Sequence, residues 1–218
     1  MKHLISHLLS NHLDSIVSQS LLHYHVRGLH SIMLLQSPER TIRLYITERS
    51  HQLYHNFPAE YGTGKLSLGF HTHHCQLTLE VVRGTILNWT VVPARHGFLA
   101  DRYLWRSPIS TEEAGGFQLD QRGDMLDTFD LRILDEGKAI HMEASAIHTV
   151  AVKPGEVAAW LVYEGREDPG YIPYTWSNAD LTAFDTTGLY LKPTEEEVLK
   201  LITEAWLLQD FSRRSLMI

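Results

Sequence analysis

Residues 70–84, FHTHHCQLTLEVVRG, constrain the fold of this chain more than any other stretch. His71 and His73 stand two positions apart and lead into an alternating apolar run. Side chains alternate between the two faces of a strand, so His71, His73, Cys75, Leu77 and Leu79 would share one face. The pattern therefore predicts a strand that carries two imidazoles and an apolar stripe into the interior of a β-barrel.

This pair of histidines is a candidate metal site. Neutral imidazole is the commonest metal ligand in proteins, and two on one strand face can bind one ion. A third ligand must come from elsewhere, and the best candidate is His148 in HMEASAIHTVAV. The chain has 14 histidines, so spacing decides rather than number. We predict that His71, His73 and His148 bind one divalent ion; the alternative is hydrogen-bonded core histidines without a metal.

Composition excludes several classes of protein. The formal net charge is −7 and no basic stripe is present, which argues against nucleic-acid binding. No apolar run has the length of a membrane span, and the first residues are a poor secretory signal. The single cysteine excludes an intramolecular disulfide and fits a reducing compartment. We expect a cytoplasmic protein that binds neither nucleic acid nor membrane.

Hydrophobic periodicity predicts a single domain over residues 1–218. Residues 1–21 predict an amphipathic N-terminal helix, 22–165 a β-barrel, and 166–218 a C-terminal extension with a helix. Many short strands at spacings of about 8–12 residues, separated by turn signals, are typical of an all-β barrel or sandwich. Thr194, followed three positions later by Glu197, forms a capping box at the start of the last helix.

The strands are expected at particular places. Residues 21–48 predict three short strands, and 107–129 predict a long excursion from the barrel, of the kind that forms lids or dimer contacts. The other expected strands span residues 65–70, 75–82, 85–92, 102–105, 129–134, 139–143, 147–152 and 157–163.

These motifs resemble the cupin superfamily. Its first motif, a glycine, a His-x-His, usually a glutamate, and a closing glycine, is matched by Gly64, His71, His73 and Gly84. Its second motif, one histidine before a hydrophobic strand, is matched by His148. The resemblance covers roughly residues 22–165. It implies an all-β double-stranded β-helix, a jelly-roll-like barrel flanked here by two helices, and a homodimer.

One departure narrows the resemblance to cupins with three histidine ligands. The family's glutamate would fall at Leu77, and Glu80 has the parity of the opposite face. Three-histidine cupins resemble the thiol dioxygenases, whose ferrous iron holds a substrate thiolate and oxygen. The gentisate-type ring-cleaving dioxygenases are an equal analogy. The resemblance implies Fe(II) as cofactor, although Ni, Zn or Mn could occupy such a site.

Arg43 is the candidate for binding a substrate anion. It lies in an expected strand at residues 41–48 among apolar neighbours, and a buried arginine needs a partner. An internal carboxylate is the more common partner and an anionic ligand is the other. The resemblance to thiol dioxygenases implies the second role, because that family keeps an arginine for the substrate carboxylate at a similar place.

Other residues near the first motif have both structural and functional interpretations. His74 would replace His73 as ligand if a bulge swapped the faces, and Gln76 or Glu80 would join only then. Cys75 is interpreted as a small buried side chain. His141 is either a support for the site or a solvent-exposed residue.

The remaining histidines and aromatic residues are expected to be structural. A second His-x-His at His23 and His25 is interpreted as surface or core residues, with a role in the site as the less common alternative. His51 and His55 are expected to face solvent. Candidates for the pocket wall, which more often are simply core, are Trp89, Tyr103, Trp105, Trp160 and Tyr163.

Three functions remain open. The first is a mononuclear non-haem Fe(II) dioxygenase that acts on a small anionic or thiol substrate. The second is a non-catalytic cupin that binds or senses a small ligand. The third is a metal-dependent sugar isomerase or epimerase, which a carboxylate pair facing the pocket would favour.

Overall fold

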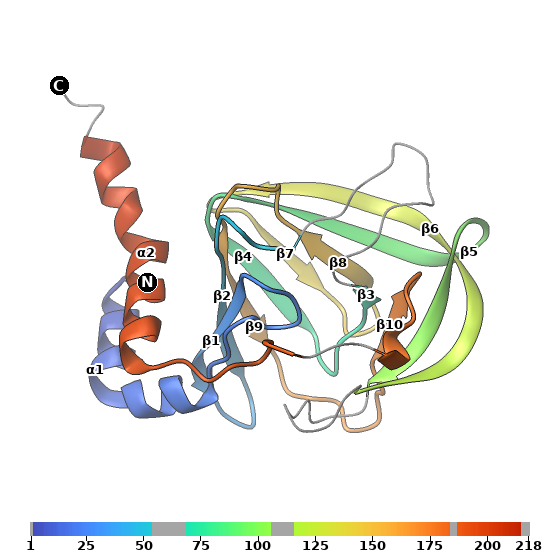
Figure 1. Cartoon of the computed structure of the whole chain (residues 1–218), viewed down its shortest axis with the longest axis horizontal. Coiled ribbons are helices and arrows are strands. Elements are labelled where there is room, and N and C mark those ends of the chain that lie inside the picture. Colours follow the sequence, from blue (N-terminus) through green and yellow to red (C-terminus); the bar gives the residue numbers. More distant parts are fainter. Residues whose placement is uncertain (1, 54–68, 106–115, 184–186, 215–218) are drawn as a thin grey trace.

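The computed structural model describes residues 2–53, 69–105, 116–183 and 187–214 of the chain. Helices stand near both ends of the sequence and strands lie between them (Figure 1). The elements are α1 Lys2–Gln19, β1 Leu29–Gln36, β2 Thr41–Thr47, β3 Phe70–His71, β4 Leu77–Arg83, β5 Thr85–Trp105, β6 Phe117–Asp135, β7 Ala139–Met142, β8 Ile147–Ala151, β9 Ala159–Glu164, β10 Tyr174–Ser177, a 3-10 turn Leu181–Ala183 and α2 Glu195–Arg214.

The strands form two antiparallel sheets. The first has the order β1-β2-β9-β4-β7 and the second the order β10-β3-β8-β5-β6, with a further pairing between β10 and β5. Neighbours such as β2 and β9 lie far apart in the sequence, so the chain crosses repeatedly between the sheets. The prediction of an all-β, jelly-roll-like barrel with a helix at each end is confirmed.

Apolar side chains from both sheets fill the barrel. On β4 the buried positions alternate, with Leu77, Leu79 and Val81 inside and the residues between them partly exposed. This alternation follows from the pleat of the strand. The same core contains Ile86 and Val150 from the second sheet. The two sheets therefore pack face to face through this cluster.

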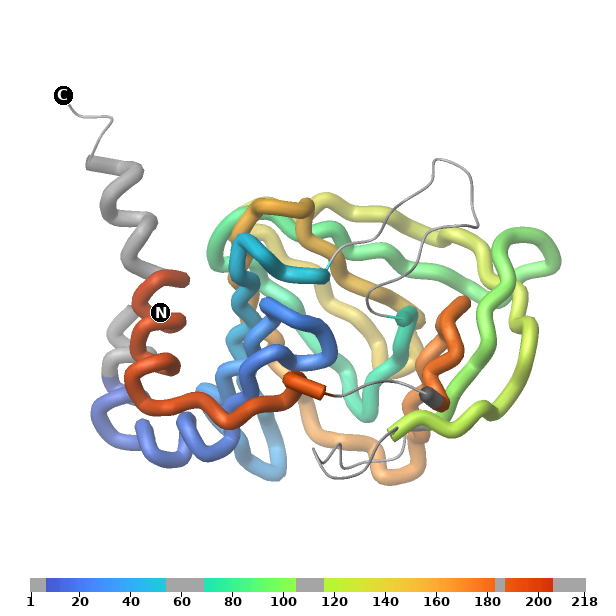
Figure 2. The backbone as a smooth tube through the Cα atoms, viewed as in Figure 1, coloured from blue at the N-terminus to red at the C-terminus, as the bar shows by residue number. Residues whose placement is uncertain are grey.

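Both helices cover the outer face of the first sheet. Ile16 of α1 and Val198 and Ile202 of α2 pack in one buried cluster with Leu44 and Leu161 of the sheet. The two helices lie on the same side of the barrel (Figures 1 and 2). No helix within the described ranges is long and apolar enough to cross a membrane.

The predicted capping box at the start of α2 is confirmed. The backbone N–H of Glu197 donates to the Thr194 hydroxyl at 3.2 Å. In return, the Thr194 backbone N–H donates to the Glu197 carboxylate at 2.7 Å. These reciprocal bonds satisfy two backbone donors at the end of the helix, and they hold the pKa of Glu197 below its usual value.

The expected excursion at residues 107–129 is wrong for the part that the structure describes. Residues 117–135 form β6, which pairs along most of its length with the 21-residue β5. β6 stands at the edge of its sheet and much of it is exposed, so it lacks a buried strand's apolar alternation. Register shifts, including one between Pro93 and Phe98, bend this hairpin. Residues 107–115 lie outside the described part.

Two smaller expectations also change, and a third falls mostly outside the described residues. Residues 21–48 contain two strands instead of three, with isolated bridges from Leu21 and Leu22 where a third was expected. β10 pairs with β3 and β5, although the polar sequence after residue 165 does not predict a strand. The expected strand at residues 65–70 lies mostly outside the described residues.

Candidate metal centre

Two short segments bring the candidate ligands together. His71 ends β3 and is the direct register partner of His148 on β8, so both side chains leave the sheet on the same side. The expected continuous strand from His71 to Leu79 is wrong, because residues 72–76 are irregular and β4 begins at Leu77. Hydrogen bonds hold this irregular segment in place. The backbone N–H of Thr72 donates to the Tyr174 carbonyl, and the Tyr174 N–H donates to the Thr72 hydroxyl. The backbone N–H of His73 donates to the Ala144 carbonyl at 3.1 Å.

The three imidazoles form one compact cluster. Their ring centroids lie 4.8 to 5.1 Å apart, and one nitrogen of each ring lies within 4.8 Å of the others. Nε2 of His73 is 2.8 Å from Nε2 of His148. Two nitrogens that bind one ion at about 2.0–2.1 Å and at right angles to each other would be about 2.9 Å apart. The nitrogens of His73 and His148 therefore have the spacing of two ligands of one divalent ion, with His71 beside them.

Two oxygen atoms behind the cluster orient the rings. Nδ1 of His148 lies 2.8 Å from Oδ1 of Asn88, and Nδ1 of His71 lies 3.1 Å from the carbonyl oxygen of Gly69. These oxygens accept hydrogen bonds, so each Nδ1 carries the proton and each Nε2 keeps its lone pair. Metal-binding histidines are usually supported in this way.

The electrostatics of the cluster favour the neutral form of each ring. Burial lowers the pKa of His71. Burial, and then the charge of the neighbouring histidines, lowers the pKa values of His73 and His148 well below the usual value. The rings are therefore unprotonated at pH 7, the state that a metal ion requires.

Replacing Asn88 by alanine is expected to weaken metal binding by about 10–100-fold, because His148 loses the acceptor that fixes its tautomer and orientation. Asn88 is 1% exposed, so the vacated position is poorly reached by water. Cobalt(II) titration followed by visible absorption measures the affinity. Asn88→Asp keeps the acceptor and should restore most of it. Equal affinity in Asn88→Ala and the parent protein would contradict this role.

Arg43 faces the barrel interior from β2 and forms an internal ion pair. Its Nε lies 3.5 Å from Oε2 of Glu164, and both side chains are about one-fifth exposed, at 20% and 23%. Burial opposes its charge, but Tyr45, Tyr24 and Glu164 together raise the pKa, so the guanidinium stays charged. The more common of the two expected partners, an internal carboxylate, is thus present.

Sequence reasoning gave His25 a role in the site only as the less common alternative to a surface or core residue. Nδ1 of His25 lies 2.9 Å from the hydroxyl of Tyr190. Burial, and then the charge of His71, lowers the pKa of His25 to about 3. Only the repeated His-x-His spacing marked this residue in the sequence.

Acidification is expected to destabilise the metal-free protein. Between the usual histidine pKa of 6.5 and the value of about 3 for His25, the unfolded chain binds a proton that the folded chain does not. Stability from this residue is therefore complete above about pH 6.5 and is lost as the pH falls toward 3. Urea unfolding with a chelator, at several pH values in this window, measures the slope. His25→Phe should reduce this slope without removing it, because the buried His73 and His148 contribute in the same direction. An unchanged slope would contradict the assignment.

The alternative ligands lie elsewhere. His74 and Gln76 are exposed, and Gln76 donates to Glu143 at 2.6 Å. Glu80 points away from the core side of β4 and accepts a hydrogen bond from Tyr163 at 2.9 Å. Leu77, at the position of the family's glutamate, is 2% exposed. Among the described residues, the three-histidine cluster therefore contains no carboxylate.

The other expected residues are mostly structural. Cys75 is buried, and burial raises its pKa to about 11, which suits a small core side chain. His141 is exposed and bonds to Thr78 at 3.1 Å. The expectation that His51 faces solvent is wrong: it is 4% exposed, because it packs against Gly28 so closely that a Cβ there would lie 2.6 Å from its Cα. His55 and Gly64 lie outside the described residues.

The aromatic candidates divide between the barrel and its surroundings. Trp160 belongs to the interior core and stacks on Tyr45 at 5.6 Å. Trp89 packs in a separate cluster against Phe70, with the ring centroids 4.7 Å apart. Tyr103 is buried and donates to the Ala179 carbonyl at 3.2 Å. The side chain of Trp105 is not described.

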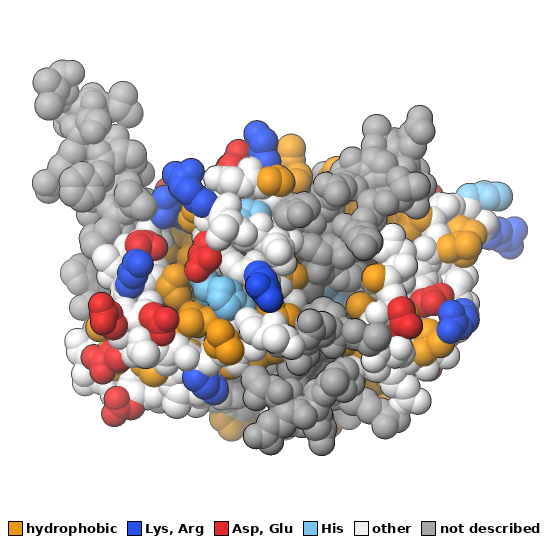
Figure 3. All heavy atoms as spheres, viewed as in Figure 1, with side chains coloured by type: hydrophobic (Ala, Val, Ile, Leu, Met, Phe, Trp, Pro, Cys, Tyr) orange, Lys and Arg blue, Asp and Glu red, His pale blue; other side chains and the backbone are white. Residues whose placement is uncertain are grey.

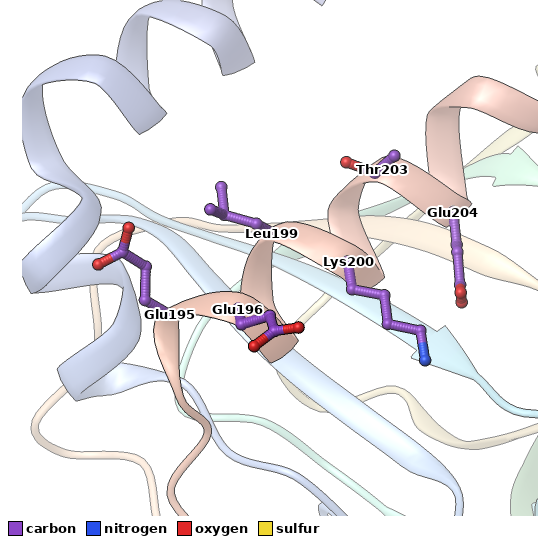
Figure 4. A pocket seen from close by; sticks show the side chains of 6 residues that line it. All are labelled: Glu195, Glu196, Leu199, Lys200, Thr203 and Glu204. Carbon is purple, nitrogen blue, oxygen red and sulfur yellow. The ribbon is translucent and has the colours of Figure 1, made fainter.

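A shallow hollow lies away from the histidines, on the exposed side of α2. Its lining is Glu195, Glu196, Leu199, Lys200, Thr203 and Glu204 (Figure 4). Acidic side chains gather over this part of the molecule (Figure 3). The hollow brings together no set of metal ligands or nucleophile with base, so it adds no candidate chemistry.

Comparisons with known proteins give likenesses of structure. No protein-family model matches the sequence, and no curated protein matches it significantly. The hydroxypropylphosphonic acid epoxidase from S. wedmorenis is 11% identical, with a TM-score of 0.37 over 67% of this chain and 56% of that chain. The chain therefore spans little more than half of that enzyme's length.

This chain covers a larger share of two further solved structures. The polyketide cyclase RemF from Streptomyces resistomycificus is 12% identical, with a TM-score of 0.40 over 83% of this chain and 92% of that one. An uncharacterized protein with a double-stranded β-helix domain from Klebsiella pneumoniae subsp. pneumoniae is 10% identical, with a TM-score of 0.34 over 70% of this chain and 86% of that one. At such identities the likeness concerns the fold alone.

Proposed function

We propose that the protein is a mononuclear metalloenzyme in which His71, His73 and His148 hold one divalent ion, with Fe(II) favoured. The observation that carries the proposal is the cluster of three neutral imidazoles, two of them oriented by oxygen acceptors behind the ring. A small set of protein ligands with open positions suits non-haem Fe(II) chemistry. When bound, ferrous iron would supply the reaction with dioxygen, which no side chain provides.

The substrate in this proposal is a small anionic or thiol-bearing molecule. Arg43 supports this because its guanidinium stays charged inside the barrel. Among the described residues, it makes a hydrogen bond through Nε alone, to Glu164. The two terminal nitrogens therefore offer a fork for a carboxylate. Arg43 would bind the acid group of the substrate while the histidines hold the metal.

The proposed setting is a cytoplasmic homodimer. Support comes from the single cysteine, which fits a reducing compartment, and from the resemblance to cupins, which commonly pair. Size-exclusion chromatography with light scattering measures the oligomeric state directly.

Oxygen uptake tests the proposed reaction. Protein purified without a chelator or histidine tag is loaded with Fe(II) under anaerobic conditions and mixed with a panel of small thiols and phenolic acids. We expect oxygen consumption with at least one compound, and a KM raised about tenfold or more in Arg43→Gln. Bound iron without oxygen uptake on any compound would contradict the dioxygenase proposal. His74→Ala, which changes an exposed neighbour, should retain activity.

A non-catalytic binding protein is the second candidate. The 2.8 Å contact between His73 and His148 can also be a direct hydrogen bond, as expected of core histidines that hold no metal. Absence of bound metal after supplementation with Fe, Zn, Ni and Mn would favour this candidate. The sugar isomerase or epimerase has less support, because the carboxylate of Glu164 is paired with Arg43.

A further inference from the structure

The edge strand β6 carries a stripe of exposed apolar side chains. Phe129 is 71% exposed, Leu131 is 47% exposed and Ile133 is 66% exposed. Exposed apolar residues are ordinary where they are scattered singly, whereas a contiguous group marks an interaction site. These three stand at alternate positions of one short stretch of one strand. The stripe therefore indicates a surface that a partner covers.

The register with β5 places the stripe on the outer face of the second sheet. Arg132 stands opposite Asn88, whose buried side chain bonds to a histidine of the metal centre inside the barrel. Successive side chains of a strand point to opposite faces, so Leu131 and Ile133 point outward. Phe129 adjoins a register shift, at which the regular pairing with β5 ends.

The same strand has a backbone edge without a partner strand. Within the described ranges, β5 is the only strand that β6 pairs with, and β6 lies along the outer margin of the barrel (Figure 1). In an antiparallel ladder, alternate residues direct their N–H and C=O groups away from the strand that is already paired. Such an edge can accept another strand. The two helices pack on the first sheet, so they leave this edge uncovered.

The sequence of this edge is complementary to itself in one antiparallel register. A two-fold axis at Leu131 sets that residue opposite its own copy, and it sets Phe129 opposite Ile133 of the second chain. On the other face, the same axis sets Asp130 opposite Arg132 of the second chain. Apolar pairs and opposite charges that face each other across two strands stabilise their pairing. By symmetry, each contact away from the axis forms twice.

Neighbouring registers lack this complementarity. An axis at Asp130 or at Arg132 brings two identical charges together, which destabilises a strand pair. An axis two residues away from Leu131 in either direction places that leucine opposite Asp127 or Asp135. In the favoured register, these two acidic residues meet each other further out. Like charge therefore confines the pairing to the central residues of the stripe.

The charged residues of this edge are already held close to each other. Nε of Arg132 forms an ion pair with Oδ2 of Asp130 in the same chain. Their side chains are 56% and 32% exposed, so both remain accessible to a second chain. In the paired edge, each charge gains an opposite charge from the partner subunit. Four charges of alternating sign would then surround the axis.

We propose that the β6 edges of two copies of this chain pair antiparallel about a two-fold axis at Leu131. The occupant of the edge is a second copy, because the strand is complementary to itself in both shape of pattern and charge. The second sheets of the two barrels then form one continuous sheet. The inference rests on the proposed homodimeric state and names its contact surface; it does not depend on the metal chemistry.

Charge reversal across the axis tests this pairing. The variants are Asp130→Lys, Arg132→Glu, and an equimolar mixture of the two proteins. Glu39→Lys and Arg122→Glu are the matched controls, because they make the same changes of charge at exposed positions away from the axis. Size-exclusion chromatography with light scattering over a dilution series measures the dissociation constant of the dimer. Circular dichroism verifies that each variant is folded.

We expect the parent protein and both controls to be dimers with similar dissociation constants. Each single variant should dissociate about tenfold more readily or worse, because both contacts between residues 130 and 132 change from attraction to repulsion. The mixture should regain the parent affinity as a heterodimer. In that heterodimer opposite charges face each other across the axis again, although neither chain keeps its internal ion pair.

A cysteine at the axis tests the same register without any change of charge. Directly opposite residues of an antiparallel pair have Cα atoms about 4.5–5.5 Å apart, within the range of a disulfide. Leu131→Cys should therefore form a disulfide-linked dimer when diamide takes up the two electrons and two protons of the thiols. Leu99→Cys, at a position that is 59% exposed on β5, should not. The native Cys75 is buried in both variants.

Each contrary result has a separate meaning. A monomeric parent protein overturns the homodimer and this inference together, and leaves the metal site untouched. A dimer that both charge variants leave unchanged places the contact elsewhere and overturns the inference alone. Weakened single variants whose mixture does not recover overturn the register at Leu131. If a charge variant fails to fold, the cysteine variants decide between the same outcomes.

Discussion

Replacing His148 by alanine is expected to abolish stoichiometric metal binding, with an affinity loss of at least about 100-fold. Loss of a supporting residue alone typically costs about 10–100-fold, and loss of a direct ligand should exceed that. His148 is 3% exposed, contacts both other imidazoles, and is oriented by Asn88, so no other described side chain replaces it. Elemental analysis of protein purified without a chelator measures the metal content.

Two surface histidines provide the control for this experiment. His74→Ala and His141→Ala remove imidazoles that are exposed and lie outside the cluster. Both variants should retain near one metal per chain. Parent-level metal in His148→Ala, or equal losses in all three variants, would refute the three-histidine assignment.

Replacing Leu79 by alanine is expected to lower the free energy of unfolding by about 2–5 kcal/mol, the cost of a buried leucine truncated to a cavity. Leu79 is 1% exposed and stands on β4 between its register partners Ile140 and Val162. Tight packing around it prevents the neighbours from closing the space. Urea unfolding monitored by tryptophan fluorescence measures the change.

Leu99→Ala is the matched control for the core truncation. Leu99 lies on β5 and is 59% exposed, so the same chemical change should alter stability by only about 0.5 kcal/mol. Similar losses in the two variants would mean that the barrel interior does not supply the main packing energy.

The sequence predicted the barrel because its interior strands alternate clearly. Leu77, Leu79 and Val81 mark the buried face of β4, and the capping box of Thr194 marks the start of α2. These signals are local, so they can be recognised without the rest of the chain. The members of the histidine cluster could also be predicted from the sequence, since His71, His73 and His148 lie together as expected.

Features that depend on contacts between distant segments were not predictable. β6 is an exposed edge strand, so its polar sequence resembles a loop although β5 supplies a partner along its length. β10 is four residues long and is defined by its pairing with β3 and β5. His25 is held by its contact with Tyr190, 165 positions away, which no spacing rule reveals.

The sheet order β1-β2-β9-β4-β7 has a consequence for biosynthesis. β9 lies in the middle of this sheet, between β2 and β4, although residues 159–164 follow the other four strands of the sheet in sequence. As the protein is synthesised from its N-terminus, β2 and β4 have no neighbour to join them until this segment leaves the ribosome. Pairings between distant residues also close slowly. The nascent chain therefore exposes an incomplete first sheet until β9 emerges after the other four strands of that sheet, and this sheet is completed only then.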